Sequence, residues 1–293
     1  MNGIVLVLVV VGVLLPGLCL GQGKMSDADR ALWVDIKVDM PKQAVKRLTD
    51  KYPLSDQLNV GKWKKYSPMS DEFKGKKLDE KKWFPVNPTW KGRQPAWFDP
   101  ENVVVKDGSL QLTMRKAEPA AMPKNEGYNT YTSAAVQSKE TTLYGYYEVR
   151  AKPMNSAGSS AFWFYKGDPD RWTEIDVFEI GGKAAGFERK MHITVHVMRT
   201  LEYDQHQSVG SAYEAPFNLA DDFHVYGLEW NEKELKFYFD GMLVRKGPNT
   251  HWTQPLTLNF DSETMPDWFG LPKDEDLPST YYVDYIRAWK AKG

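Results

Sequence analysis

The stretch RWTEIDVFEIGG, residues 171–182, places three carboxylates, Glu174, Asp176 and Glu179, in an otherwise apolar run. Side chains of a strand alternate between its two faces, so Glu174 and Asp176 share one face and Ile175 takes the other. Glu179 has the opposite parity, and one extra residue beside Val177, a β-bulge, would return it to the face of Glu174. The stretch therefore predicts a bulged strand with one acidic face and one apolar face.

Short runs rich in β-branched and aromatic residues recur on both sides of this strand, from about residue 63 to the C-terminus. Asp107-Gly108 and Asp240-Gly241 each separate two such runs, and Asp-Gly is a strong hairpin signal. Many short strands with hardly any helix predict an all-β fold, an antiparallel sandwich or barrel. We expect one such domain over residues 58–293.

The composition narrows the function classes. The 293 residues carry a formal net charge of −1, which excludes a strongly basic nucleic-acid surface. The chain has 11 Trp and 15 Tyr, which suit strands or flat rings that stack on ligands. Cys19 is the only cysteine, so a Cys-based metal site or nucleophile is not expected.

The N-terminal part of the chain reads as two segments. An apolar run from Ile4 to Leu15, followed by a proline and small residues, predicts a signal peptide over residues 1–21 and export to the extracellular or periplasmic space. The alternative is a membrane anchor. Residues 22–57 are polar and charged, and we interpret them as an extension, a linker or a strap, with a short helix around Ala44 to Leu48.

Two carboxylates on one face would suffice for retaining glycoside hydrolysis, in which one attacks the sugar carbon and the other protonates the leaving oxygen. A third acid between them can hold a shared proton and separate the two pKa values. The alternative is a solvated strand face with scattered acids. The neighbouring Trp172, Ile175, Val177 and Phe178 are apolar, which favours the catalytic interpretation.

The segment EIDVFE resembles the active-site motif E-[IL]-D-x-x-E of glycoside hydrolase family 16 in its bulged form. The segments SDEF, NVVVKDGSLQLTMRK, YGYYEVRAKP, AFWFYK, FHVYGLEWN, FYFDG and YYVDYIRAWK stand in the order that the family has them, over about residues 60–291. The resemblance implies a jelly-roll β-sandwich of two antiparallel sheets with a concave substrate cleft. It implies Glu174 as nucleophile, Asp176 as helper acid and Glu179 as general acid/base.

Substrate contacts are also implied by the resemblance. The loop NPTWKGRQPAWF is similar to one that supplies a stacking Trp in agarases, with Trp90 as the best match and Trp97 as the second. Trp163, beside the catalytic strand, could stack as well or belong to the core. LNFDSETMPDWFGLP resembles the agarase segment whose Glu binds a sugar hydroxyl, which points to Glu263.

The strand MHITVHVMR resembles the one after the active site in the algal-galactan branch, which implies substrate contacts by His196 and Arg199. A strand His is more often structural. Sulfated substrates need cationic partners, and Arg93, Arg199 and Lys183 are candidates.

Many family members hold a structural calcium on the convex side. The resemblance places its oxygen ligands near Glu72, Gly108 and Asp284. No cofactor is expected for catalysis itself.

These observations predict a secreted, monomeric, endo-acting retaining hydrolase that cleaves β-1,4 linkages of an algal galactan, with agarose as the first expectation. Porphyran and κ-carrageenan or furcellaran are alternatives. A laminarin-type β-1,3-glucanase is another, and a non-hydrolytic carbohydrate-binding protein is the alternative from a different class. No nucleic-acid partner is expected, nor a membrane after signal removal.

Overall fold

The computed structural model describes residues 27–40, 42–201 and 206–292. The expected signal peptide, residues 1–21, lies outside these residues. Within the described part of the chain, no helix is long and apolar enough to cross a bilayer.

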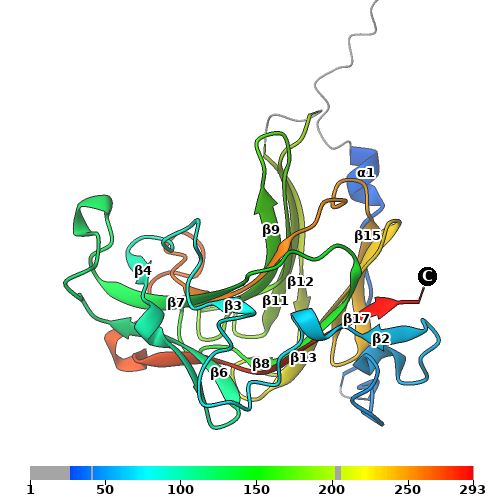
Figure 1. Cartoon of the computed structure of the whole chain (residues 1–293), viewed down its shortest axis with the longest axis horizontal. Coiled ribbons are helices and arrows are strands. Elements are labelled where there is room, and N and C mark those ends of the chain that lie inside the picture. The colour runs from blue at the N-terminus through cyan, green and yellow to red at the C-terminus, as the bar shows by residue number, and fades with distance from the viewer. Residues whose placement is uncertain (1–26, 41, 202–205, 293) are drawn as a thin grey trace, which may run out of the picture.

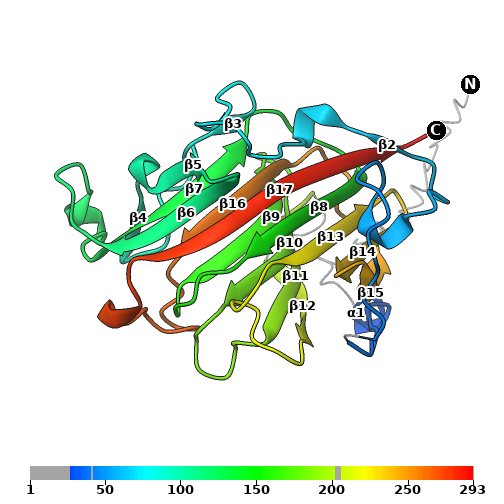
Figure 2. The ribbon, with the colours of Figure 1, turned by 90° about the horizontal axis from the view of Figure 1, so that it is seen from below.

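Two antiparallel sheets make up the molecule (Figures 1 and 2). Sheet B has the order β12 (Gln207–Glu214), β11 (Lys190–Arg199), β10 (Trp172–Gly181), β9 (Ser159–Gly167), β16 (Thr257–Glu263), β7 (Tyr131–Ser138) and β3 (Trp83–Phe84). Sheet A has the order β1 (Val34–Asp35), β15 (Met242–Pro248), β14 (Glu234–Phe239), β13 (His224–Trp230), β8 (Gly145–Lys152), β17 (Ser279–Ala291), β6 (Ser109–Lys116) and β5 (Val103–Lys106), with β2 (Trp63–Lys65) on the end of β17.

The two sheets are linked along one edge. There β6 pairs with β7, and the short β4 (Ala96–Phe98) adds to β7 in parallel. The helices are one-turn segments: α1 (Asp27–Ala31), η1 (Leu54–Asp56), η2 (Ser67–Met69), η3 (Pro100–Asn102), η4 (Lys124–Glu126) and η5 (Asp274–Asp276). The predicted all-β sandwich of two antiparallel sheets is thus confirmed.

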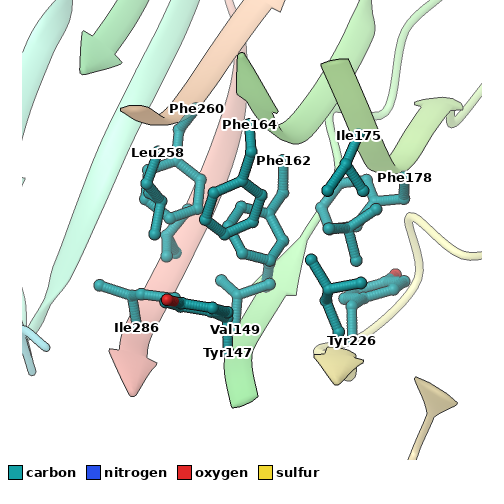
Figure 3. Close-up of a cluster of buried hydrophobic side chains, with 14 of the residues drawn as sticks. Tyr147, Val149, Phe162, Phe164, Ile175, Phe178, Tyr226, Leu258, Phe260 and Ile286 are labelled. Atoms are coloured by element: carbon teal, nitrogen blue, oxygen red, sulfur yellow. The ribbon is translucent and has the colours of Figure 1, made fainter. Parts of the chain in front are cut away.

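The hydrophobic core fills the space between the two sheets (Figure 3). Phe162 and Phe260 of sheet B stack with ring centroids 5.1 Å apart, and both are fully buried. Val149 and Ile286 of sheet A lie opposite and are buried as well. Because strand side chains alternate, each strand of sheet B turns one row into this core and the other row outward.

Both predicted Asp-Gly hairpins are present. Asp107 and Gly108 have φ of 52° and 77°, and Asp240 and Gly241 have φ of 46° and 79°. Positive φ at both central residues is the geometry of a type I′ turn, which matches the twist of the flanking strands.

The helix expected around Ala44 to Leu48 is wrong, because the only α-helix among the described residues is α1. The backbone N–H of Val45 donates to the carbonyl of Asp240 at 3.2 Å. The N–H of Leu48 donates to Oε1 of Gln57 at 2.6 Å. These tertiary partners take the donors that a helix would use, so residues 44–50 run as an irregular strap over sheet A.

The strap covers a buried charge. Glu148 of β8 is fully buried and forms an ion pair with Arg47, which is itself mostly buried. The same carboxylate accepts hydrogen bonds from the backbone N–H of Leu54 at 2.6 Å and from the hydroxyl of Tyr285 at 2.9 Å. A buried carboxylate with this many donors ties the strap to the sheet.

We expect Arg47→Met to lower the free energy of unfolding by roughly 3 kcal/mol, because buried Glu148 loses its counter-charge. Burial raises the pKa of Glu148 and Arg47 opposes that rise, so the variant raises this pKa further. A carboxyl whose folded pKa exceeds its unfolded pKa contributes less stability as pH rises through that interval. The loss should therefore be larger at about pH 8 than at about pH 5.

Urea unfolding at the two pH values measures this effect. Lys46→Met, at an exposed neighbouring position of the strap, is the matched control. Equal losses in both variants would contradict the role of the buried pair.

Candidate active site

A cavity of about 660 Å³ opens on the outer face of sheet B. It is lined by Thr89, Trp90, Arg93, Gln137, Ala161, Trp163, Tyr165, Lys166, Gly167, Trp172, Glu174, Asp176, Glu179, Met198, Arg199, Thr257 and Glu263. All three acids of the bulged stretch are in this set, together with most of the substrate-contact residues expected from the sequence.

The predicted bulge is present in β10. Asp176 pairs with Trp163 of β9, whereas Phe178 pairs with the adjacent Phe162, so Val177 is the extra residue. The pairing with β11 shifts over the same interval. As a result Val177 and Phe178 are both buried, and Glu179 returns to the cavity face.

His196 lies directly across from Glu174, as its cross-strand partner on β11. Its Nε2 is 3.0 Å from Oδ2 of Asp176 and 4.0 Å from Oε1 of Glu174. The side chains of His196 and Asp176 are thus close enough for an ion pair when the imidazole is protonated. Burial disfavours the charged imidazole, yet the two carboxylates outweigh it and raise the pKa of His196. His196 therefore acts on the acids and does not itself line the cavity.

The environment separates the pKa values of the two outer acids. Burial, together with repulsion from Asp176, raises the pKa of Glu174 to about 8, although His196 and Arg93 oppose the rise. Burial raises the pKa of Glu179 well above its usual range, and repulsion from Asp176 and other nearby carboxylates adds to the rise. His196 and Arg93 oppose the rise for Glu174, whereas four carboxylates add to the effect of burial on Glu179. Glu174 therefore ionises more readily, and Glu179 retains its proton.

Strand β16 carries two further acids, of which Glu263 lines the cavity and Asp261 does not. Glu263 is buried and its Oε2 accepts a hydrogen bond from Nε of Arg93 at 2.8 Å. Burial raises the pKa of Glu263 to about 7, against the lowering effect of Arg93. Asp261 is buried and its Oδ2 accepts from the indole N–H of Trp163 at 2.6 Å. The sequence interpretation missed Asp261, although its spacing from Glu263 repeats that of Glu174 and Asp176.

Trp90 and Trp163 line the cavity as expected, and they support each other. Their rings meet edge to face at 6.2 Å, and Trp90 also contacts Phe98 at 5.0 Å. Trp163 is 9% exposed and stacks on Tyr165 at 4.7 Å. Trp163 thus belongs to the cavity wall and to the packing beneath it.

Trp97 does not line the cavity. In β4 the side chains of Ala96 and Phe98 are buried, and Trp97 has the opposite parity. The sequence interpretation did not predict Trp172, the first residue of β10, as a substrate contact, although it lies within residues 171–182. Its side chain lines the cavity and is 38% exposed.

Two of the three candidate cations are at the cavity. Arg93 is half-exposed beside Glu263, and Arg199 is exposed and donates to the carbonyl of Asp168 at 3.1 Å. Lys183 forms an ion pair with Asp276 and is not among the lining residues.

The residues expected to hold calcium are engaged elsewhere. Glu72 accepts hydrogen bonds from Nε and Nη2 of Arg287, both at 2.9 Å, and Asp284 accepts from Arg150 at 2.9 Å. Gly108 lies in the β5–β6 turn. As placed, the two carboxylates fit arginine rather than an oxygen-rich calcium site. The calcium site stays a prediction.

Comparisons with known proteins agree with this geometry. Residues 63–291 match a family model described as "β-porphyranase A–D, GH16 domain". β-Porphyranase B of Zobellia galactanivorans is 34% identical over 253 residues, covering 78% of this chain and 85% of that protein. The crystal structure of porphyranase B from that organism matches with a TM-score of 0.69 at 31% identity, covering 78% of this chain and 92% of the other. A β-agarase of Phocaeicola plebeius is 27% identical over 284 residues, covering 82% of this chain and 89% of that protein.

We expect Trp163→Phe to lower the free energy of unfolding by about 1–3 kcal/mol, because it leaves buried Asp261 without its indole donor. Burial and Glu263 raise the pKa of Asp261, and Trp163 opposes them, so the variant raises this pKa further. The ionised form then costs more, and the loss should grow as pH rises.

Urea unfolding at about pH 6 and about pH 9 checks this expectation. Trp172→Phe, at the exposed mouth of the same cavity, should leave the midpoint unchanged. A Trp163→Phe midpoint equal to that of the parent protein at both pH values would contradict the dependence of Asp261 on Trp163.

Proposed function

Since this chain belongs to glycoside hydrolase family 16, we propose that it is an endo-acting hydrolase of a sulfated algal galactan, with porphyran ahead of agarose as the substrate. One observation carries the catalytic part of the proposal. The bulge in β10 brings Glu174 and Glu179 to the same cavity, with environments that separate their pKa values.

In the proposed reaction, ionised Glu174 attacks the sugar carbon and forms a covalent glycosyl ester. Protonated Glu179 gives its proton to the glycosidic oxygen, and the shortened chain leaves as an alcohol. Glu179 then takes a proton from water, whose oxygen hydrolyses the ester. Two inversions at the sugar carbon retain its β-configuration, and each carboxyl returns to its starting state.

Asp176 lies between the two acids in sequence and contacts His196. We assign it the role of tuning protonation, because a carboxylate beside Glu174 and Glu179 raises the pKa of both. A sugar-binding protein without hydrolysis would have no need for three acids at one cavity, which supports the enzyme over that alternative.

Agarose is the first expectation from the sequence, and the comparisons favour porphyran instead. The matching family model carries the name of porphyranases, and the porphyranase relative is more similar to this chain than the agarase. Arg93 and Arg199 at the cavity support a sulfated substrate, since guanidinium groups bind sulfate through charge-assisted hydrogen bonds.

Export by way of the 1–21 signal peptide remains part of the proposal, because a hydrolase of a large polysaccharide must meet it outside the cell. The proposal also keeps a monomeric enzyme. N-terminal sequencing of the secreted protein and light scattering would test these two points.

The function is tested by incubating the protein separately with porphyran, agarose, κ-carrageenan, furcellaran and laminarin and analysing the released oligosaccharides. We expect the highest kcat/KM on porphyran, with products several sugars long. Proton NMR in the first minutes should show the β-anomer. Release from laminarin alone would overturn the galactan assignment.

Glu174→Gln and Glu179→Gln should each abolish hydrolysis while the fold is retained, because neither role has a substitute. Asp176→Asn should cost less than Glu174→Gln, since it changes protonation and not a bond to the sugar. Turnover near that of the parent protein in either Gln variant, with unchanged circular dichroism, would sink the assignment.

Arg199→Met should lower kcat/KM on porphyran by about 10–100-fold, from the 1.5–3 kcal/mol of a hydrogen bond to a charged group, and leave agarose cleavage nearly unchanged. Lys183→Met is the matched control, because Lys183 pairs with Asp276 away from the cavity. Equal losses of kcat/KM on porphyran and agarose would show that Arg199 does not bind the sulfate group.

A further inference from the structure

The N-terminal residues 27–35, which we term the clasp, join the outer edges of the two sheets. In the clasp, β1 pairs with β15 of sheet A, and Asp35 forms an ion pair with Arg245 of that strand. On the other side, Ser211 of β12 donates to Oδ2 of Asp35 at 2.7 Å, and Arg30 donates to the carbonyl of Ser208. The clasp thus closes the edge opposite the β6–β7 junction (Figure 1).

Trp33 is the side chain that the clasp inserts toward the core. Its ring meets Trp252 edge to face, with centroids 6.0 Å apart and an angle of 86°. The guanidinium of Arg245 lies 5.2 Å from the Trp33 ring centroid on another side. A Cβ at Gly247 would meet the Trp33 ring at 2.2 Å, so the observed position of this ring requires glycine at residue 247.

Trp252 contacts Trp33 on one side and the acidic strand β10 on the other. It is fully buried, and its indole N–H donates to the carbonyl of Glu174 at 2.8 Å and to the carbonyl of His196 at 3.1 Å. Its own backbone is fixed, with its N–H donating to Asn249 at 2.9 Å and its carbonyl accepting from Trp230 at 2.8 Å. The indole N–H of Trp252 thus holds the backbone carbonyls of both Glu174 and His196, whose side chains lie near Asp176.

We propose that the clasp, acting through Trp33 and Trp252, positions Glu174 and His196 for the reaction. Trp33 and Trp252 are positioning residues, since neither lines the cavity. Loss of the Trp33 contact lets the Trp252 ring shift, and the two carbonyls that it holds shift with it. A displacement of about 1 Å at a reacting group can cost about 100-fold in rate. The clasp precedes the residues that match the family model.

The kinetic test, which rests on the proposed function, compares full-length Trp33→Ala, Trp33→Phe and Gly247→Ala. Gly247→Ala displaces the ring of Trp33 without changing that residue. We expect Trp33→Ala and Gly247→Ala to lower kcat about tenfold, with KM within about twofold of the parent value. Trp33→Phe keeps an aromatic ring at this position, so its kcat should stay close to that of the parent protein. Val34→Ala, at an exposed neighbouring position of β1, should leave both constants unchanged.

Trp252→Phe should lower kcat as well, because it removes the indole N–H. If Trp33 acts through Trp252, the double variant Trp33→Ala/Trp252→Phe has a kcat no lower than that of Trp252→Phe alone. Multiplied losses would overturn the proposed route.

A second readout needs no substrate. The His196 imidazole is faced by Asp176, Glu174 and His206, whose Nε2 lies 2.8 Å from its Nδ1. Its NMR titration therefore reports the geometry of the acid cluster. In Trp33→Ala and Gly247→Ala we expect the pKa of His196 to fall toward its ordinary value. His192, at the other end of β11, should titrate as in the parent protein.

The outcomes separate the two proposals. A protein that cleaves no polysaccharide fails the proposed function, while the His196 titration still decides the role of the clasp. If the variants melt at lower temperature with kcat and the His196 titration unchanged, the clasp only stabilises the fold and the inference is overturned. If Trp33→Ala does not fold, Gly247→Ala, which displaces the Trp33 ring, decides by the same criteria.

Discussion

One extra residue in β10 is the constraint on which the site depends. Without the bulge at Val177, the alternation that sends Glu174 and Asp176 to the cavity would bury Glu179 in the core. With it, both Val177 and Phe178 enter the core and all three acids face outward. The local departure from strand geometry is stabilised by apolar burial on the opposite face, so the packing between the sheets and the chemistry of the cavity are set by the same residue.

The cavity holds the acids close together with few cations beside many carboxylates, so some of the acids must stay protonated. Glu179 is near Asp176, Glu174, Glu263 and Asp261, and their mutual repulsion together with burial raises its pKa. His196 and Arg93 oppose the corresponding rise for Glu174. The difference in charged surroundings makes Glu179 the proton donor and Glu174 the acid that ionises more readily. A site of this kind needs a rigid support, and the aromatic core beneath β9 and β10 provides it (Figure 3).

The parts of this structure that local sequence determines could be predicted, and the parts that depend on distant partners could not. The Asp-Gly turns and the bulge follow from backbone preferences and alternation within a few residues. The helix around Ala44 to Leu48 fails because Asp240 and Gln57 take its backbone donors. The sequence ranks Trp90 ahead of Trp97 but keeps both as candidates, and the parity of β4 is what excludes Trp97. The ring contact between Trp33 and Trp252 joins residues far apart in the sequence, and no local pattern predicts it.

The two long edges of the sandwich are closed by different means, and the acids lie near the weaker one. At one edge β6 pairs with β7, so backbone hydrogen bonds join the sheets. At the other edge β12 ends sheet B, and the acidic strand β10 is only two strands inside it. Edge strands carry unpaired backbone groups and open more easily than central ones. A clasp that holds β12 and β15 together, and that reaches Trp252 behind Glu174, therefore acts where the acid geometry has the least support from the sheet itself.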